Sequence, residues 1–583
     1  MLQQLFYVTI ITATFLLWGL PLYLLASRYQ SFLDFWAPTV LSKLCLLFFS
    51  GLVTVSVLTN WAVLVLPADH RLLTGLIIAG GALAARNKKQ VAELLRMWRF
   101  GPATYRHRIA LGFLLCGGVT LLLLGILQPV HPDTNIYHVQ IVRWTNEYGT
   151  VPGVANLFAR YGLNSAWFNL VALFKMPFFG MANYTWLNTT VALWFLLWLC
   201  DKWLQDRPDP AGNGTRNTLR PFYLLVMVYC FFEWEIIRDA ANSANYDFIV
   251  FALMFIVLSG MLQSLLEHRK ETVGDLILYL IAACSLITFK LSGMFLLGAV
   301  LVSLLRIRKR TGWFLAMLTS ALILPPLLIK NYITSGYPLF PLSFAPLAPD
   351  WQVPQGITDH LRQYIYVSNR LYNQRFSMAA VPELMHLPWL ALWFKGLLLQ
   401  QKIVVSLALA SPLCLLAPIG PRDLRKKMIL LFAAIASMFI GWMLTAPSPR
   451  FAYGFLLIMA FIPVSLLLRS KITEPVQSGI LLLLCGSLIF YAARKTALLH
   501  GDATYLLHTM QIKESRSERI DLNGHEFRLP YLFPDSWKRD CRDNLLPCIF
   551  QRNPYLQYRG DEPGQGFRMR PLPDSVFIRN YIY

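Results

Sequence analysis

The sequence predicts an all-α polytopic membrane protein with about 14 transmembrane helices and a small soluble C-terminal domain. Of its 583 residues, 56% are hydrophobic and only 14% are charged, too few to cover a soluble protein of this length. Runs such as 111–127 and 476–493 carry no charge and are long enough to cross a hydrocarbon core. The net charge of +21 is concentrated in short loops between apolar runs, which is typical of cytoplasmic loops. We therefore expect contact with membrane lipids and none with nucleic acid.

The apolar runs and basic loops together predict a topology. The expected spans are 5–26, 38–66, 70–86, 109–129, 184–204, 219–236, 246–267, 273–289, 291–306, 312–330, 402–419, 428–446, 452–469 and 477–493. The basic loops are 86–108, 201–220, 268–270, 306–310, 422–427 and 469–471. Placing these loops in the cytoplasm gives one consistent alternation, with both termini outside.

Three regions follow from this topology. Residues 1–108 contain extra N-terminal helices and a basic cytoplasmic loop, and 109–493 form a transmembrane core with outer loops at about 130–183 and 331–401. Residues 494–583 mix acidic and basic residues freely and are expected to form a periplasmic domain with little helix. Its two cysteines, Cys541 and Cys548, are expected to form a disulfide if this compartment is oxidising.

Two segments need separate interpretation. Residues 164–180 are apolar, but the stretch is short and is interrupted by Lys175 and Pro177. A crossing here would move later basic loops outside, so we expect an interfacial or re-entrant helix. The run 273–306 is too long for one span, and a lysine at the bilayer centre would be costly. A helical hairpin with Lys290 at its outer tip avoids that cost.

The first outer loop opens with the sequence HPDTNIYH at 131–138. Asp133 should lie near the membrane surface, where partial desolvation tends to raise a carboxyl pKa and suits a general base acting on an alcohol. Two alternatives remain open. Asp133 could cap the following helix, or His131 and His138 could bind a metal with it. No further ligand repeats that spacing, so a divalent metal is possible without a clear motif, and the cofactor is unknown.

More ionisable groups lie at other outer span ends. The chain places Glu233, Glu235 and Arg238 together after one span, and Asp247 at the start of the next. Such groups are costly at a bilayer edge unless they pair or bind a ligand. Arg238 could pair with Glu235 or with Asp239, or the segment could form the polar wall of a site.

Three cations also fall at outer span ends, namely Lys290, Lys330 and Arg450. Each could extend to the headgroups, or all three could converge on a phosphate, with Arg450 held by a proline-rich turn. In the second outer loop, Trp389 and Trp393 predict an interfacial helix starting near Pro388, which could frame a groove for a lipid tail or anchor the loop.

The order of these features resembles the GT-C glycosyltransferases, multi-span enzymes that use polyprenyl-phosphate-linked sugars. In that superfamily the first large outer loop carries an acidic residue soon after a span, and Asp133, Tyr137, His138 and Trp144 match in order. The segments LITFKLSG, IKNYITSGYPLFP and SPRFAYGF, and the acid at Asp247, also fit. The likeness covers about residues 109–470 and is closest to poorly characterised bacterial members with a polar C-terminal tail.

This resemblance implies an enzyme of a bacterial inner membrane. It would transfer a sugar from a polyprenyl-phosphate-linked donor to a cell-envelope glycan or lipid acceptor on the periplasmic side, with Asp133 as the catalytic residue. The substrate-binding residues would be Tyr137, His138, Glu233, Glu235, Arg238, Asp247, Lys290, Lys330 and Arg450. Two other functions remain open: a polysaccharide ligase or polymerase, and a transporter or flippase of a lipid-linked glycan.

Overall fold

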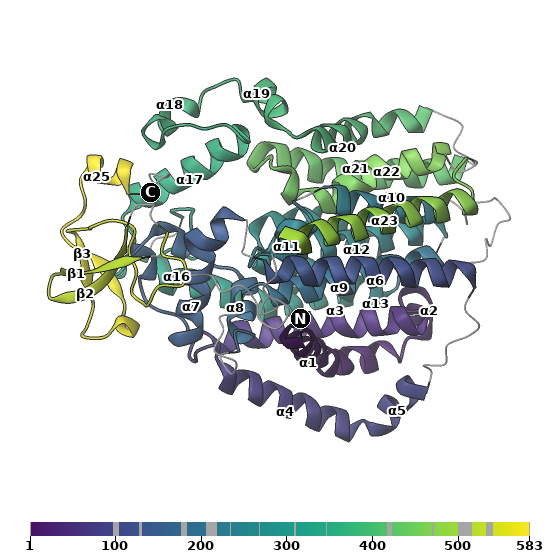
Figure 1. Cartoon of the computed structure of the whole chain (residues 1–583), viewed down its shortest axis with the longest axis horizontal. Coiled ribbons are helices and arrows are strands. Elements are labelled where there is room, and N and C mark those ends of the chain that lie inside the picture. The colour runs from purple at the N-terminus through teal and green to yellow at the C-terminus, as the bar shows by residue number, and fades with distance from the viewer. Residues whose placement is uncertain are drawn as a thin grey trace.

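The computed structural model describes residues 2–96, 104–127, 131–176, 184–205, 219–233, 235–267, 269–307, 310–344, 347–416, 422–468, 471–498, 516–531 and 540–581. Helices dominate these residues, and most of them run side by side along the long axis of the molecule (Figure 1). A small sheet-containing region closes one end, where α7, α8 and α16 also lie (Figure 1). Parts of the predicted basic loops, at 97–103, 206–218, 268, 308–309 and 469–470, lie outside the described residues.

The first helices pack through two glycines. Helices α1 (Leu2–Ala26) and α3 (Val40–Ala62) lie against each other, with the short α2 (Gln30–Trp36) between them in sequence. A Cβ atom at Gly19 would lie 1.9 Å from the Leu47 carbonyl oxygen, and one at Gly51 would lie 1.7 Å from that of Phe15. Glycine is therefore required at both positions for the backbones to approach so closely. The chain continues into α4 (His70–Arg86) and α5 (Lys88–Arg96).

Six segments of the described chain are long and apolar enough to cross a membrane. They are α1, α3, α6 (Tyr105–Ile126), α12 (Asp247–Leu266), the α15–α16 segment (Arg310–Ile323 and Pro325–Ser335) and α23 (Glu474–Leu498). Further helices of the bundle are α9 (Trp186–Leu204), α10 (Leu219–Phe232), α13 (Val273–Phe289), α14 (Leu296–Ile307), α20 (Leu399–Ala410), α21 (Arg422–Thr445) and α22 (Tyr453–Leu468). These helices are compatible with a multi-pass membrane protein, whereas the expected number of about 14 spans rests on the sequence alone.

Helices α12 and α22 form the centre of the bundle. Both are apolar on all sides, and most of their residues are buried, as expected for helices enclosed by other helices. They pack against each other, and α13, α10 and α20 surround them. Because α12 begins at Asp247 and α22 follows Arg450, their packing brings these two residues to the same end of the bundle.

Of the two segments that needed separate interpretation, the structure shows the expected hairpin, whereas the expected interfacial or re-entrant position of 164–180 stays a prediction. Helix α13 ends at Phe289, and after Lys290 the chain turns through η6 (Leu291–Phe295) into α14. Lys290 therefore lies at the tip of a helical hairpin. In the 164–180 stretch, the described helix is α8 (Ala166–Leu173), whose 8 residues are all buried. Eight residues extend about 12 Å, too short to cross a bilayer.

Short helices make up the outer loops at the sheet end of the molecule. They are η1 (Thr134–His138), α7 (Val139–Glu147), η2 (Val154–Asn156), η3 (Ala159–Gly162), α11 (Arg238–Ala241), α17 (Gln355–Arg370), η7 (Met378–Ala380), α18 (Val381–Leu384), α19 (Trp389–Gly396) and η9 (Pro449–Phe451). A further short helix, η8 (Ser411–Leu416), instead directly follows α20. Helix α19 starts directly after Pro388. The indole of Trp393 is buried and donates to the Pro447 carbonyl, so this residue anchors the loop to the bundle.

The C-terminal region contains two small antiparallel sheets. Strand β1 (Ser517–Leu522) pairs with β2 (His525–Pro530), and β3 (Leu556–Tyr558) pairs with β4 (Phe567–Met569). The first turn is Asn523–Gly524, with φ of 57° and 83°, and this dipeptide favours such two-residue hairpins because both positions need positive φ. The turn η10 (Pro563–Gln565) and the helix α25 (Ser575–Asn580) complete the region, and a disulfide joins Cys541 to Cys548.

The C-terminal region packs onto the first outer loop. The Phe567 amide donates to the Pro152 carbonyl at 3.0 Å, and the Tyr581 hydroxyl donates to the Asn156 carbonyl.

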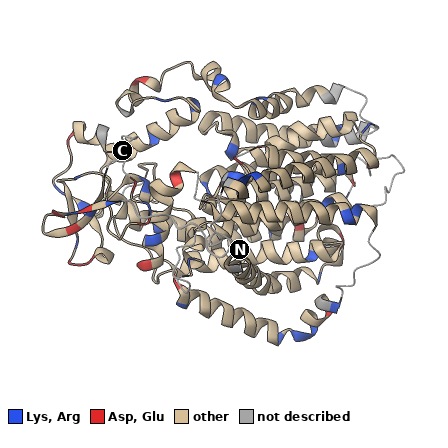
Figure 2. Ribbon diagram, viewed as in Figure 1, with Lys and Arg blue, Asp and Glu red and all other residues tan. Residues whose placement is uncertain are grey.

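At the end of the bundle opposite the sheets, where α5 lies, several Lys and Arg residues occur together (Figure 2).

Candidate functional site

Asp133 precedes a turn of π-helix. The turn, η1, is a single π-helical turn that continues directly into α7, and the Asp133 side chain makes no capping hydrogen bond to it. The capping interpretation of this residue is therefore wrong. Single π-turns inside helices are rare and frequently occur at functional sites. The side chain is instead 25% exposed, with one oxygen 3.5 Å from the Arg160 guanidinium.

Arg160, in η3, is the ion-pair partner of Asp133. Its side chain is only 7% exposed, and its guanidinium lies 5.8 Å from the ring centre of Tyr137 and 5.1 Å from that of Tyr364. The sequence interpretation missed this residue. An arginine inside the apolar stretch around η3 was the available signal, because a buried guanidinium needs a carboxylate or an aromatic face.

A second acid, Asp247, holds two of the predicted cations together. Lys290 donates to one of its oxygens, and the Arg450 Nε lies 3.3 Å from the other. The Asn245 side-chain amide also donates to Asp247 at 3.0 Å. The side chains of Asp247, Lys290 and Arg450 are 10%, 16% and 29% exposed, respectively. They form a largely buried ion cluster at the end of α12 that faces the C-terminal sheets.

His131 links this ion cluster to the first outer loop. Its Nε2 lies 2.8 Å from an Arg450 guanidinium nitrogen and 3.1 Å from the Asn245 amide nitrogen. Arg450 also lies close enough to Asp133 for their charges to interact. Asp133, Lys290 and Arg450, which come from three distant parts of the sequence, thus belong to one charged group at the end of the bundle that carries the sheets.

Neighbouring positive charges keep Asp133 ionised. Burial acts to raise the pKa of Asp133, but the neighbouring His131, Arg160 and Arg450 outweigh burial and hold the pKa below its ordinary value. The expectation of a raised pKa is wrong because surrounding cations favour the ionised form more strongly than desolvation disfavours it. Asp133 is therefore a persistent negative charge and a weak base.

Tyr137 and His138 are buried residues of η1, and their side chains pack the turn against its neighbours. The Tyr137 hydroxyl forms a hydrogen bond with that of Tyr246. The His138 ring stacks on His131, with ring centres 5.9 Å apart, and lies 4.8 Å from the ring centre of Phe168. His138 is 1% exposed, and burial lowers the pKa of His138 from 6.5 to about 3. The imidazole is therefore neutral at neutral pH.

The buried, neutral state of His138 predicts acid sensitivity. Because the pKa of His138 in the folded protein lies below its unfolded value, its contribution to stability is complete above pH 6.5 and falls as the pH drops toward 3. At pH 5 the loss should be about 2 kcal/mol. Thermal unfolding in detergent at pH 7.5 and 5.0 measures it. His138→Gln should reduce this pH dependence, whereas His525→Gln, in the β2 hairpin, should retain it; equal pH dependence in all three proteins would contradict the assignment.

Lys330 lies apart from the ion cluster. Its ammonium group is buried where α16 passes beneath α7 and α8, and it donates to Thr145 at 3.1 Å and to Asn169 at 2.5 Å. The expectation that Lys330 shares a phosphate site with Lys290 and Arg450 is therefore not met. The ammonium group binds neutral side-chain oxygens of α7 and α8. Lys330 therefore holds these two helices to the bundle and does not face the ion cluster.

The two glutamates after α10 contact the second outer loop. Glu235 accepts hydrogen bonds from the Tyr372 hydroxyl at 2.6 Å and from the Gln401 amide at 3.0 Å, and its charge also acts on Arg450. Glu233 is fully buried beside it. Glu235 therefore connects the ion cluster to the second outer loop, and Glu233 and Arg238 also line a neighbouring cavity.

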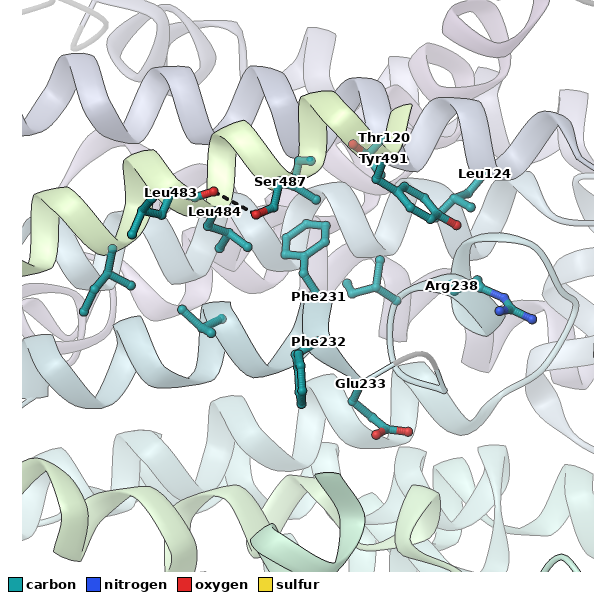
Figure 3. A pocket seen from close by; sticks show the side chains of 14 residues that line it. Thr120, Leu124, Phe231, Phe232, Glu233, Arg238, Leu483, Leu484, Ser487 and Tyr491 are labelled. Carbon is teal, nitrogen blue, oxygen red and sulfur yellow. Dashed lines mark hydrogen bonds between the residues drawn. The ribbon is translucent and has the colours of Figure 1, made fainter. Parts of the chain in front are cut away.

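That cavity has a volume of about 430 Å³ and opens on the side of the bundle between α6, α10 and α23. Leu124, Phe231, Phe232 and Leu483 contribute to its largely apolar lining, and Glu233 and Arg238 lie toward one end of it (Figure 3). Phe232 is 61% exposed and Leu483 is 74% exposed, so the rim is apolar as well. An apolar cavity with charged groups at one end suits the tail of an amphipathic lipid.

Among the described residues, His, Cys, Asp and Glu side chains form no group of three that could hold a metal ion. His131 is close to His138, but it is bonded to Arg450 and Asn245 through Nε2.

The chain belongs to the family described as a domain of unknown function (DUF8201), whose model matches residues 1–457. The matched region includes Asp133, Asp247, Lys290 and Arg450. No curated protein and no solved structure matches the chain.

Proposed function

We propose that this DUF8201 member is a membrane glycosyltransferase that moves a sugar from a polyprenyl-phosphate-linked donor to a cell-envelope glycan or lipid acceptor. The observation that carries the proposal is the single charged group formed by Asp133, Asp247, Lys290 and Arg450. It offers two cations for a phosphate and an ionised carboxylate beside them for an alcohol.

The topology that we propose places this group on the periplasmic side of a bacterial inner membrane. A described helix overlaps each of the expected spans, which supports about 14 crossings. The disulfide of the C-terminal region lies at the same end as the charged group, and disulfides persist in oxidising compartments. Basic residues at the opposite end support a cytoplasmic location for that end.

The donor is an amphipathic anion, and two features of the chain suit its two parts. The phosphate would bind Lys290 and Arg450, with the Arg450 guanidinium able to form two parallel hydrogen bonds. The tail would lie in the side cavity between α6, α10 and α23, which is apolar and opens where the bilayer would be. Glu235, whose charge acts on Arg450, and Glu233, which lines the cavity, are two residues apart in the chain and connect the two features.

The reaction forms one bond and breaks one. The acceptor hydroxyl oxygen bonds to the anomeric carbon, while the bond between that carbon and the phosphate oxygen breaks and its electron pair stays on the phosphate. Lys290 and Arg450 stabilise the charge of the leaving phosphate. Asp133 orients the hydroxyl and accepts its proton late, once the attacking oxygen has become cationic and strongly acidic. A weak base is sufficient for this late transfer.

Sugar transfer by the purified protein in membrane vesicles tests the proposal. The assay supplies labelled polyprenyl-phosphate sugars as donors and the vesicles' own glycans and lipids as acceptors. Arg450→Gln should lower kcat/KM for the donor by about 10²–10³-fold, because one charge contact to the leaving group is lost. Arg362→Gln, an exposed arginine of α17, is the matched control and should retain activity.

Three other results would change the assignment. Absence of transfer from every polyprenyl-phosphate sugar by the wild-type protein would overturn the proposal. Transfer of preassembled oligosaccharides alone would indicate a ligase or polymerase. Movement of the lipid-linked glycan across the membrane without transfer would indicate a flippase.

A further inference from the structure

We infer that the disulfide-closed loop from Cys541 to Cys548 positions the π-helical turn that directly follows Asp133. The C-terminal region would then be part of the site rather than a separate appendage. The inference rests on the proposed function only for its kinetic consequence. The effect of the loop on the stability of the turn can be measured without any substrate.

The loop holds the turn through the backbone of η1 and through one buried side chain. The Arg542 amide donates to the Asn135 carbonyl at 3.2 Å. The Gln140 side-chain amide donates to the carbonyls of Arg542 and Asn544 at 2.9 and 3.0 Å. Gln140 is 0% exposed, so these two hydrogen bonds are shielded from water while the loop is in place.

A second set of contacts holds the loop through Asp543. Its carbonyl accepts from the Arg143 guanidinium at 2.7 Å, and its carboxylate accepts from the Tyr184 hydroxyl at 2.6 Å. Arg143 belongs to α7, and Tyr184 lies just before α9. The loop is thus attached both to the helix that continues from η1 and to the transmembrane bundle.

The disulfide keeps the loop in the shape that makes these contacts. Arg542 has a φ of 45°, in the left-handed region that residues other than glycine adopt only when their surroundings enforce it. The Asn544 amide closes the turn onto the Cys541 carbonyl at 2.9 Å. The disulfide then ties Cys541 to Cys548, which is bridged to Arg528 of β2.

The consequence for Asp133 follows from its place in the chain. Asn135, which accepts the hydrogen bond from the loop, is two residues after Asp133 and inside the π-turn. A single π-turn has poorer geometry than α-helix and persists where tertiary contacts favour it. Without the loop, η1 should relax, and Asp133 should lose its fixed distance from Arg160.

Two variants test this role, the double variant Cys541→Ser/Cys548→Ser and the single variant Gln140→Leu. Hydrogen exchange of residues 134–143 should become faster in both, measured in full-length protein in nanodiscs. In the transfer assay, kcat should fall about 10²-fold, because displacement of a catalytic group by about 1 Å has an effect of this size. KM for the donor should stay unchanged, because Lys290 and Arg450 remain in place. Gln565→Leu, at an exposed glutamine of η10, is the control for the same substitution away from the loop.

The outcomes separate the two proposals. Unchanged exchange of residues 134–143 would overturn the inference whatever the activity. Faster exchange with unchanged kcat would also overturn it, since the loop would then not position Asp133 for transfer. If the wild-type protein transfers no sugar, the proposed function fails, but faster exchange would still support the hold of the loop on the turn. If the double variant does not fold, Gln140→Leu alone decides.

Discussion

Replacing Asp133 with asparagine should lower kcat for sugar transfer by about 10²–10⁴-fold, the range of positioned acid–base groups. The substitution keeps the size of the side chain and one acceptor oxygen, but it removes the negative charge and the proton-accepting site. Binding of the donor should change little, because the phosphate contacts belong to Lys290 and Arg450. Initial rates at saturating donor, compared with those of the wild-type protein, measure the effect.

Asp359→Asn provides the matched control for this experiment. Asp359 lies on α17 in the second outer loop, and its side chain is 29% exposed, close to the 25% of Asp133. It pairs with Arg362 at 3.4 Å, as Asp133 pairs with Arg160 at 3.5 Å. We expect full activity for the control. Retained turnover in Asp133→Asn would remove Asp133 from the mechanism.

Replacing Asp247 with asparagine should destabilise the protein by about 3–5 kcal/mol, as when one partner of a buried ion pair is removed. The carboxylate lies between Lys290 and Arg450, so its neutralisation leaves two cations in a poorly solvated place. Thermal unfolding of the purified protein in detergent, monitored by tryptophan fluorescence, measures the change.

A second variant separates charge from packing at this position. In Asp247→Leu/Lys290→Met, one acid and one base are removed together, so only Arg450 loses its partner, whereas Asp247→Asn leaves both Lys290 and Arg450 without theirs. This double variant should be more stable than Asp247→Asn. If the two proteins unfold at the same temperature, loss of charge balance is not the cause of the destabilisation.

The helical architecture could be predicted from the sequence because it depends on local properties. A charge-free run of sufficient length predicts a membrane helix wherever it occurs, and Lys290 within a long apolar run predicted the hairpin that the structure shows. The weak helical character and free mixing of charges after residue 494 similarly predicted a separate region of different structure. The number of crossings still depends on this reasoning alone.

The charged group could be predicted only in part. Asp133, Lys290 and Arg450 were identifiable because ionisable residues beside apolar spans are costly unless they pair or bind a ligand, but sequence position does not show which of them meet. Lys330 has the same kind of position as Lys290, yet the neighbouring helices offer it neutral oxygens inside the bundle. Arg160 and the bridging role of His131 depend on tertiary contacts, and so does the pKa of Asp133.

Binding of undecaprenyl phosphate to the purified protein in nanodiscs tests the central claim most directly, because it requires no knowledge of the acceptor. The account predicts saturable binding that is weakened about 10²-fold or more by Arg450→Gln and by Lys290→Gln, and that is unchanged by Arg362→Gln. Binding of equal strength to all four proteins, or no binding above that of an ordinary anionic phospholipid, would contradict it.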